Sequence, residues 1–483
     1  MMKKTQSSWV LPLVGFIEFF ERFGFYTLQG IMILYFLKVH HFSQEKAYHV
    51  FGAFSALLYG FVGVGGFCGD KIFGPKKTLF LGLVVMMIGY LSLTFYAKEA
   101  LFPALAAVCL GNALFKANPG AILGHLYQHH PEKLHSAFTI FYMTVNVGAL
   151  FALILGPYLS SHYGYAYAFG ASAVGIFIAI LAVLFQHHRL NIALSDQVYP
   201  AVRGITLLLG GCLLLAIWAL ITFLLSSYEW VICGLKIVIV GVLIIYWQVC
   251  RKEQGLVRHK MYAVLILMVE AVIFFTLYHQ MPTSINIYAI MHVHPQLFGW
   301  TLDPQSFQAL NPFWIIIWSP ILAKFYEKNA ISRHPWSIFR KFSIGMSCCA
   351  MSYVILYISQ YFHDATYHVS SLWLVVSYIF QSLAELFVSG LGLAMVAELV
   401  PDYRMGGVMG MWFLTSAVAG FTGAKVASYT AVPTGLASAS LESLQNFCQV
   451  FGQIAFVVLV MALIMVFSAK FFEKMIGLNS ELK

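Results

Sequence analysis

Long runs of apolar residues, separated by short polar segments, dominate the chain. A helix that crosses a bilayer needs about 20 mostly apolar residues. On that rule, the pattern predicts fourteen spanning helices. They cover residues 10–37, 47–68, 78–97, 101–126, 136–160, 165–186, 203–225, 230–250, 261–290, 307–326, 339–361, 371–398, 405–430 and 447–472. The first run is too long and too interrupted for the apolar region of a signal peptide, so we take it as the first span.

Several of these runs contain ionisable residues, which are costly inside a membrane. Such groups usually face a cavity or one another, and they mark a substrate or proton path. Those that lie well inside the predicted spans are Glu18, Glu21, Arg22, Lys116, Lys236, Glu270, His279 and Glu385. We therefore expect a polar cavity within the bundle.

The first run holds three of these charges. Glu18, Glu21 and Arg22 are spaced i, i+3 and i+4, which places them on one face of a helix. Tyr26 and Gln29 continue that face. A structural ion pair that only pins the bundle is an alternative. Three charges leave one acid in excess, however, and a carboxylate that shares one Arg can change protonation readily. We therefore favour a proton-binding role for Glu18 and Glu21.

Composition supports a polytopic membrane protein. Of the 483 residues, 60% are hydrophobic and only 10% are charged, whereas soluble domains carry about 25% charged residues. The eight cysteines form no CxxC pair and lie mostly within apolar runs. We expect them to pack as small apolar residues, with no disulfide, no metal site and no cofactor.

Positive charge is distributed unevenly among the predicted loops. Alternate loops contain most of the Lys and Arg residues, on the same side as Lys3 and Lys4 at the N-terminus and Lys483 at the C-terminus. The opposite loops hold little beyond Lys38, Lys46 and Lys98. Because cytoplasmic loops are enriched in Lys and Arg, both termini are expected in the cytoplasm. This bias also accounts for the net charge of +9, so no nucleic-acid partner is needed.

The basic segments 187–202 and 251–260 bracket two spans that contain few polar residues. These spans look like a hairpin inserted between two six-helix halves. This 6+2+6 order, with the loop "GGFCGDKIFGPKK" at 65–77, resembles one branch of the major facilitator superfamily. The fold expected is all-α, with an N-terminal bundle over 1–190, a linker and hairpin over 191–258, and a C-terminal bundle over 259–483. In such proteins the substrate site lies between the halves.

Longer motifs make the resemblance more specific. "EFFERFGFY" is similar to the ExxERFxYY signature of the proton-dependent oligopeptide transporter family, and "FYMTVNVGALF" is similar to its FYxxINxG element. "LYHQMPTSINIYA" and "FQSLAELFVSGLGLAMVAELVP" resemble most closely the bacterial dipeptide and tripeptide permeases of that family. The similarity runs from about residue 10 to residue 472.

The resemblance implies a set of roles by position. The peptide carboxylate site of the family corresponds to Arg22 and Lys116, and its amino-end site to Glu385, Asn146 and Asn311. Residues lining the cavity correspond to Tyr26, Tyr59, Trp412 and Ser416, and the proton-coupling acids to Glu18 and Glu21. Lys116 and Glu385, on equivalent helices of the two halves, are expected to pair when the cavity closes. A static salt bridge between them is the alternative.

Two positions depart from the family pattern. Phe25 replaces one tyrosine of the signature. Many members also have an acid and an Arg that form an outer gate, at positions that are His279 and Gln29 here, so this ion pair cannot form. His279 titrates near neutral pH when unperturbed, and it is either a proton relay or, as we favour, a hydrogen-bonding cavity residue. For Glu270 we favour a helix-capping or helix-pairing role.

We therefore expect a non-enzymatic, proton-coupled symporter that imports di- and tripeptides by alternating access. Its setting is expected to be the lipid of a bacterial inner membrane, with the monomer as the functional unit. Within the same fold, nitrate or an amine-like solute is an alternative cargo. An integral membrane enzyme is less favoured because no catalytic constellation is found, and a primary pump is less favoured because the sequence has no GxxxxGK[ST] motif. A sensor without transport activity is also less favoured, because it would be expected to carry a soluble output domain and the sequence pattern shows none.

Overall fold

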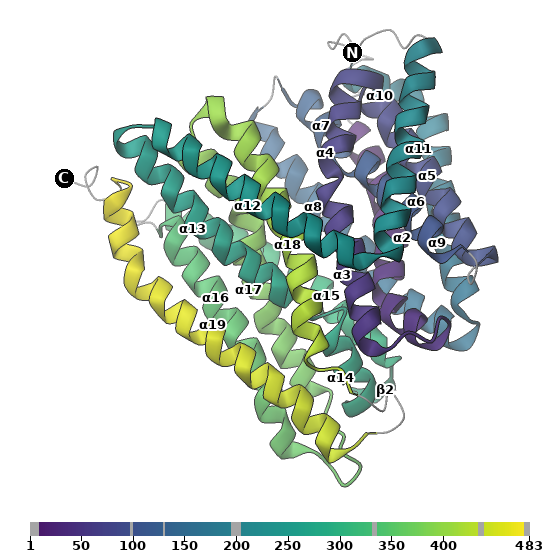
Figure 1. Cartoon of the computed structure of the whole chain (residues 1–483), viewed down its shortest axis with the longest axis vertical. Coiled ribbons are helices and arrows are strands. Elements are labelled where there is room, and N and C mark those ends of the chain that lie inside the picture. The colour runs from purple at the N-terminus through teal and green to yellow at the C-terminus, as the bar shows by residue number, and fades with distance from the viewer. Residues whose placement is uncertain are drawn as a thin grey trace. The chain divides into compact units, whose positions relative to one another are not determined.

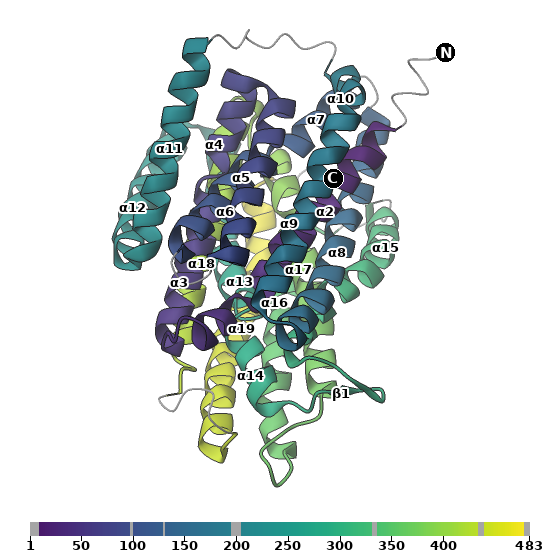
Figure 2. The same ribbon diagram turned by 90° about the vertical axis from the view of Figure 1, so that its right-hand side faces the viewer.

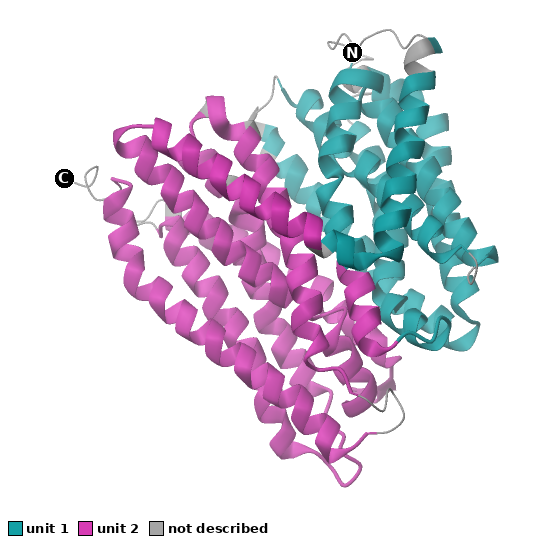
Figure 3. Cartoon of the chain, in the orientation of Figure 1, with its two compact units in different colours: residues 1–42, 53–231 teal, residues 43–52, 232–483 magenta. Residues whose placement is uncertain are grey.

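In the computed structural model, helices account for nearly all of the described residues. The structure describes residues 9–96, 100–128, 131–194, 204–330, 336–432 and 439–477. It divides into two compact units, one of residues 1–42 and 53–231 and one of residues 43–52 and 232–483 (Figure 3). Helix α3 (Gln44–Gly60) contributes residues to both units. The loop residues Lys3, Lys4, Lys98 and Lys483 lie outside the described residues.

The first unit is a bundle built around α2 and α5. Its elements are α2 (Val10–Lys38), the second half of α3, α4 (Val62–Phe67), the π-helix η1 (Cys68–Phe73), α5 (Pro75–Phe95), α6 (Leu101–Lys116), α7 (Asn118–Leu126), α8 (Pro131–His162), α9 (Tyr165–Phe185), α10 (His187–Ala193) and α11 (Gly204–Ser226). Helix α2 packs against α8 and α9, and α5 packs against α6 and α9 (Figures 1 and 2).

The second unit is a bundle built around α16 and α17. From residue 232 on, its elements are α12 (Tyr228–Lys252), α13 (Gly255–Tyr278), α14 (Ser284–His292), β1 (Gln296–Leu297), β2 (Trp300–Thr301), η2 (Pro304–Ala309), α15 (Leu310–Ala330), α16 (Ile338–Ser359), η3 (Gln360–Phe362), α17 (Leu372–Leu399), α18 (Asp402–Ser428) and α19 (Leu441–Met475). Helix α16 packs against α17 and α19, and α13 packs against α18 (Figure 1).

Twelve helical segments of the described chain are long and apolar enough to cross a membrane. This confirms the expected all-α, polytopic fold. Helices α2 and α15 are also long, but they are not among the twelve, and α2 contains the three buried charges at 18, 21 and 22. The count of fourteen spans therefore stays a prediction.

The predicted spans at 101–126 and 261–290 are interrupted rather than straight. The span at 101–126 divides into α6 and α7 at Ala117, next to Pro119, which has no N–H to donate to a helix. The span at 261–290 divides into α13 and α14, and the Leu277 carbonyl accepts hydrogen bonds from the Gln280 N–H at 3.0 Å and the Tyr353 hydroxyl at 2.7 Å. Such bonds satisfy a carbonyl that water cannot reach.

Small residues allow the helices of the first unit to approach closely. A Cβ atom built on Gly82 would lie 2.7 Å from the carbonyl oxygen of Gly111, and one built on Gly111 would lie 2.7 Å from that of Gly82. Gly65 similarly faces the backbone of Ala113. In lipid, where the hydrophobic effect does not drive helices together, close van der Waals packing of this kind stabilises their association. They fix the position of α6, the helix that carries Asn112 and Lys116.

Helix α11 and helix α12 differ in their packing. Helix α11 contacts α6, and the indole N–H of Trp218 donates a 2.9 Å hydrogen bond to the Pro103 carbonyl. Helix α12 exposes most of its apolar side chains, and Tyr246, which is buried, donates a 2.8 Å hydrogen bond to the Met261 carbonyl of α13. The exposed faces of the two helices are mostly apolar, as expected for contact with lipid, although Lys236 of α12 is also exposed.

Candidate functional site

The three charges of α2 form one buried cluster. The Arg22 Nε atom lies 3.2 Å from Glu18 Oε1 and also pairs with Glu21. Glu21 is fully buried, and Glu18 and Arg22 are 6% and 4% exposed. The helical spacing predicted from the sequence therefore brings all three groups together.

Helix α6 supplies the partners of this cluster. The Asn112 amide donates a 2.7 Å hydrogen bond to Glu21 Oε1. One turn later, Lys116 is close enough to interact electrostatically with Glu18, Glu21 and Arg22. Sequence reasoning missed Asn112. The available signal was its position four residues before Lys116, which places both side chains on one face of α6.

The cluster retains unused hydrogen-bonding capacity. Within the described residues, Glu18 Oε2 and Arg22 Nη2 are buried and have no hydrogen-bond partner. Leaving such atoms unpaired is costly unless a ligand, water or proton satisfies them. The arrangement can therefore accept a proton at the carboxylate and an anionic group at the guanidinium.

Aromatic rings cover both cations. The Lys116 ammonium lies 4.1 Å from the centre of the Tyr59 ring, and the Arg22 guanidinium carbon lies 5.1 Å from the centre of the Phe25 ring. Cation–π contacts of this length are attractive. Phe25, the departure from the family signature, thus contacts Arg22 through its ring. Tyr26, next to it, is partly exposed and packs edge-on against Phe25.

The other predicted residues of the first unit lie on the adjoining helices. Asn146 of α8 is 6% exposed, and its amide donates a 2.9 Å hydrogen bond to the Tyr142 carbonyl of its own helix. Two residues on, Gly148 lets α8 approach the Phe19 carbonyl and the Arg22 side chain of α2. Gln29 is partly exposed, two turns beyond Arg22 on α2.

The second unit contains a separate polar pair. The Asn311 amide of α15 donates a 2.8 Å hydrogen bond to Glu385 Oε2 of α17, and Ser382, one turn before Glu385, donates to the Asn311 carbonyl at 3.2 Å. Glu385 and Asn311 are both buried. The structure thus brings together two of the three residues predicted for the amino-end site, and Ser382 is an addition.

Helix α18 carries the predicted aromatic and hydroxyl residues. Trp412 is 5% exposed, and its ring centre lies 6.0 Å from that of Phe275. A Cβ atom on Gly392 would overlap the Trp412 indole, so this glycine makes room for the ring. Ser416 follows one helical turn later and is also buried. Helices α13, α17 and α18 therefore hold Trp412 in one orientation.

His279 lies where α13 ends. Its ring is buried and edge-on to Phe51 at 6.5 Å, and its Nδ1 atom has no hydrogen-bond partner within the described residues. The neighbouring Gln280 amide donates to the Thr276 and Gly423 carbonyls at 2.9 and 3.0 Å. Sequence reasoning missed this link between α13 and α18.

Glu270 differs from its expected role as a cap. It is buried in the middle of α13, and its Oε2 atom has no hydrogen-bond partner within the described residues. The capping role is therefore wrong, because the nearest end of the helix is eight residues away at Tyr278. The alternative, a helix-pairing role, stays a prediction.

Buried charges that are not fully paired, inside a polytopic helical bundle, are typical of a membrane transport protein. The model of the POT family matches residues 76–442, and the chain belongs to this family. The fold is the all-α, polytopic fold of this family, and the protein is a multi-pass protein of the inner membrane.

Named relatives cover almost the whole chain. It is 41% identical over 479 residues to the dipeptide and tripeptide permease B of Xenorhabdus bovienii, covering 96% of this chain and 97% of the relative. It is also 41% identical over 465 residues to the dipeptide and tripeptide permease A of Escherichia coli, covering 96% and 92%.

Solved structures of the family share the fold. A bacterial homologue of the human drug peptide transporters PepT1 and PepT2 superposes with a TM-score of 0.85 at 29% identity, covering 97% of this chain and 99% of that one. Tetrameric PepTSo2 gives a TM-score of 0.84 at 29% identity with the same coverage.

Proposed function

We propose that the protein is a proton-coupled symporter that imports di- and tripeptides across the inner membrane by alternating access. The observation that carries this proposal is the buried cluster of Glu18, Glu21 and Arg22 with Lys116 nearby, in a chain 41% identical to dipeptide and tripeptide permeases. A zwitterionic peptide needs a cation at one end and an acid at the other, and the described residues contain both.

Arg22 and Lys116 bind the peptide carboxylate in this proposal. Arginine presents a planar fork that suits a carboxylate, and Arg22 Nη2 is a donor with no protein partner among the described residues. The positive charge of Lys116 adds attraction without fixed geometry. Tyr59, which lies against the Lys116 ammonium, limits where that group can move.

Glu385 binds the peptide amino group, with Asn311 and Asn146 as hydrogen-bonding partners of the peptide. Asn311 already orients the Glu385 carboxylate, which lowers the cost of holding it ready for a cation. Tyr26, Trp412 and Ser416 line the binding region and tolerate varied peptide side chains. Fixed ends and an adaptable middle give broad specificity.

Glu18 and Glu21 carry the coupling proton. Both share the single Arg22 guanidinium, so a peptide carboxylate that draws on Arg22 weakens its hold on the acids and favours their protonation. Peptide and proton therefore bind cooperatively. In the cycle, the acids load a proton from outside and release it inside after the bundles rock.

His279 and Gln29 take the place of the outer ion pair. His279 sits at the break between α13 and α14, where its ring packs against Phe51 rather than against a charge. We assign it a role as a hydrogen-bonding cavity residue rather than a proton relay, since its buried Nδ1 has no protein partner among the described residues. Gln29, on the face of α2 that carries the acids, contributes hydrogen bonds only.

The proposal also covers the membrane topology, the functional unit and the division of the chain. Both termini lie in the cytoplasm, the monomer transports, and the halves span 1–190 and 259–483 with a linker and hairpin at 191–258. The Lys and Arg content of alternate loops supports the orientation. No cofactor other than protons takes part.

Ligand-induced stabilisation of the purified protein tests the choice of substrate. Ala-Ala should raise the melting temperature, since a ligand at 100 times its Kd stabilises by about 2.7 kcal/mol. Blocking the amino group by acetylation, or the carboxylate by amidation, should weaken the effect. Stabilisation by nitrate and not by Ala-Ala would favour the alternative cargo instead.

A further inference from the structure

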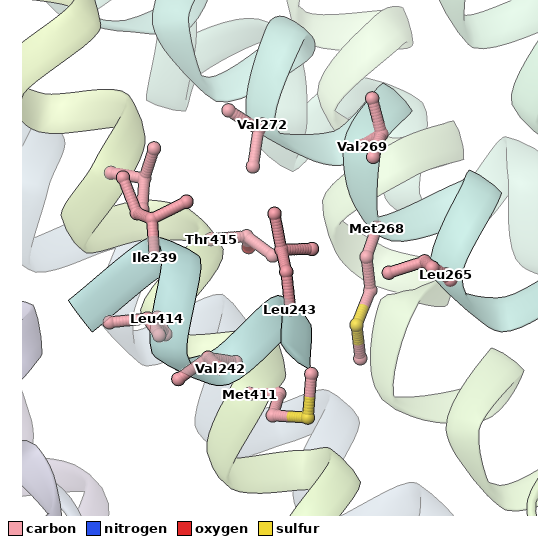
Figure 4. A pocket seen from close by; sticks show the side chains of 11 residues that line it. Ile239, Val242, Leu243, Leu265, Met268, Val269, Val272, Met411, Leu414 and Thr415 are labelled. Atoms are coloured by element: carbon pink, nitrogen blue, oxygen red, sulfur yellow. The ribbon is translucent and has the colours of Figure 1, made fainter. Parts of the chain in front are cut away.

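An apolar cavity of about 200 Å³ lies between α12, α13 and α18 within the second unit (Figure 4). Its wall is formed by Ile239 and Leu243 of α12, Met268 and Val269 of α13, and Met411 and Thr415 of α18, with further apolar side chains between them. Thr415 is the one residue with a polar side chain in this lining, and its hydroxyl donates to the Trp412 carbonyl at 2.6 Å. The cavity therefore offers an occupant almost no hydrogen-bonding groups.

The cavity opens onto the outer apolar surface of the unit. Two of its lining residues, Leu243 and Val269, are 43% and 49% exposed, whereas Met268 is buried. An apolar cavity of about 150 Å³ stays dry and accepts apolar guests. A dry cavity of this size with a mouth toward hydrocarbon accepts a lipid acyl chain.

Positive charge lies at the same end of α12 and α13. Arg251 and Lys252 end α12, and Arg258 and Lys260 begin α13. Glu253 lies between them and is bound by the Arg404 Nε at 3.2 Å and the Tyr403 hydroxyl at 2.7 Å. The negative charge of Glu253 is thus offset by Arg404, and the basic residues at this end remain in excess.

The distance between the basic residues and the cavity fits the length of a single phospholipid. Arg251 lies eight residues from Leu243, or about 12 Å along the helix at ~1.5 Å per residue. Half of the ~30 Å hydrocarbon core is about 15 Å, so a chain whose headgroup lies at Arg251 reaches the cavity. The Arg251 guanidinium carbon stacks 4.8 Å from the centre of the half-exposed Trp247 ring, an arrangement typical of the membrane interface.

We propose that this cavity binds an acyl chain of an anionic phospholipid whose headgroup is held by Arg251 and Lys252. The basic residues provide charge complementarity to an anionic headgroup, as do basic sites at the ends of other spanning helices. The bond from Tyr246 to Met261 fixes α12 to α13 one turn from the cavity, so the acyl chain fills the space where these helices separate. This inference does not depend on the transport activity.

Photolabelling of the full chain in phosphatidylethanolamine vesicles tests the proposal. Phosphatidylglycerol and phosphatidylcholine, each with a diazirine at the end of one acyl chain, serve as probes, and labelled peptides are identified by mass spectrometry. The phosphatidylglycerol probe should label residues 239–243 and 411–418 at least fivefold more than the phosphatidylcholine probe. That ratio corresponds to about 1 kcal/mol for a single Lys or Arg near an anionic headgroup.

Matched variants separate cavity binding from general lipid contact. Ile239→Trp fills the cavity and should abolish labelling of 411–418, whereas Val240→Trp, at a neighbouring exposed position, should not. Arg251→Gln with Lys252→Gln should reduce labelling by phosphatidylglycerol to the level of phosphatidylcholine, and Lys470→Gln on α19 should not. Equal labelling by both probes, labelling of α12 without α18, or no effect of Ile239→Trp would overturn the proposal.

Discussion

Arg22 couples the acids of α2 to the proposed substrate site, because it can interact with both. It pairs with both Glu18 and Glu21, lies against Phe25, and retains a buried donor with no protein partner among the described residues. Glu21 differs from Glu18 in that Asn112 also holds it. A change at Glu21 therefore tests whether the proton site and the peptide site can be separated.

Glu21→Gln should abolish uphill peptide uptake and retain counterflow exchange of peptide. Glutamine keeps the size of the side chain and can still accept the hydrogen bond from Asn112, but it does not titrate in this range. The measurement compares accumulation and counterflow of a labelled dipeptide in vesicles. Glu45→Gln is the control, because Glu45 is an exposed acid on α3. Full uphill uptake by Glu21→Gln would remove Glu21 from the coupling role.

The residue patterns predicted from the sequence are those that one helix determines. The spacing of Glu18, Glu21 and Arg22 predicts their common face because helical periodicity is local. The bond from Asn112 to Glu21 could not be predicted, since it depends on the register between α2 and α6. The same reason explains why Gln280, which bonds across to Gly423, was missed.

At the scale of elements, close helix contacts in the first unit determine where α6 places its side chains. Gly82 of α5 and Gly111 of α6 contact each other through their backbones. Asn112 follows Gly111 directly. Both helices were predicted from the sequence, but this contact could not be, because each run contains more than one glycine.

Gly82→Ala should therefore destabilise the protein, by about 1–3 kcal/mol as for other overpacked sites. The added methyl group would lie 2.7–2.8 Å from backbone atoms of Gly111 and Phe115, which cannot move aside without shifting α6. The readout is the melting temperature of the purified protein. Gly63→Ala is the control, since nothing lies within 4 Å of its Cβ position. A lower melting temperature for Gly63→Ala than for Gly82→Ala would contradict this account of the packing.

The loop between α16 and α17 provides a pH-dependent element outside the spans. Asp364 Oδ1 accepts hydrogen bonds from the backbone N–H groups of His368 and Thr366 at 3.0 and 2.8 Å, and Oδ2 lies 2.9 Å from His294 Nε2. The His368 N–H and the Thr366 groups hold the pKa of Asp364 well below its ordinary value. The carboxylate therefore stabilises the loop above the unfolded pKa of about 3.9.

Hydrogen exchange at Thr366 and His368, corrected for the intrinsic rate, measures this effect. Protection should be constant from neutral pH down to about pH 4 and should decline as the pH falls further toward the folded pKa. Asp364→Asn should lose protection already at neutral pH and lose its acid dependence. Unchanged protection in this variant would show that Asp364 does not hold the loop.

At the scale of the whole molecule, the fold class could be predicted because membrane spans are long and continuous in sequence. The family followed from motifs such as "EFFERFGFY", and the match over residues 76–442 confirms it. The interruptions of the spans at Ala117 and at 279–283 were not predicted. Pro119 and Pro282 lie at these breaks and were a signal in the sequence. The hydrogen bond from Tyr353 to Leu277 depends on tertiary packing and could not be predicted from one run.

Accumulation of labelled Ala-Ala in proteoliposomes, with and without an inward proton gradient, tests the central claim most directly. With the gradient, the peptide should accumulate above its external concentration, and a protonophore should abolish the accumulation. Without the gradient, uptake should stop at equilibration. Equal uptake in both conditions, or no uptake in either by a protein that is folded and correctly inserted, would contradict proton-coupled peptide transport.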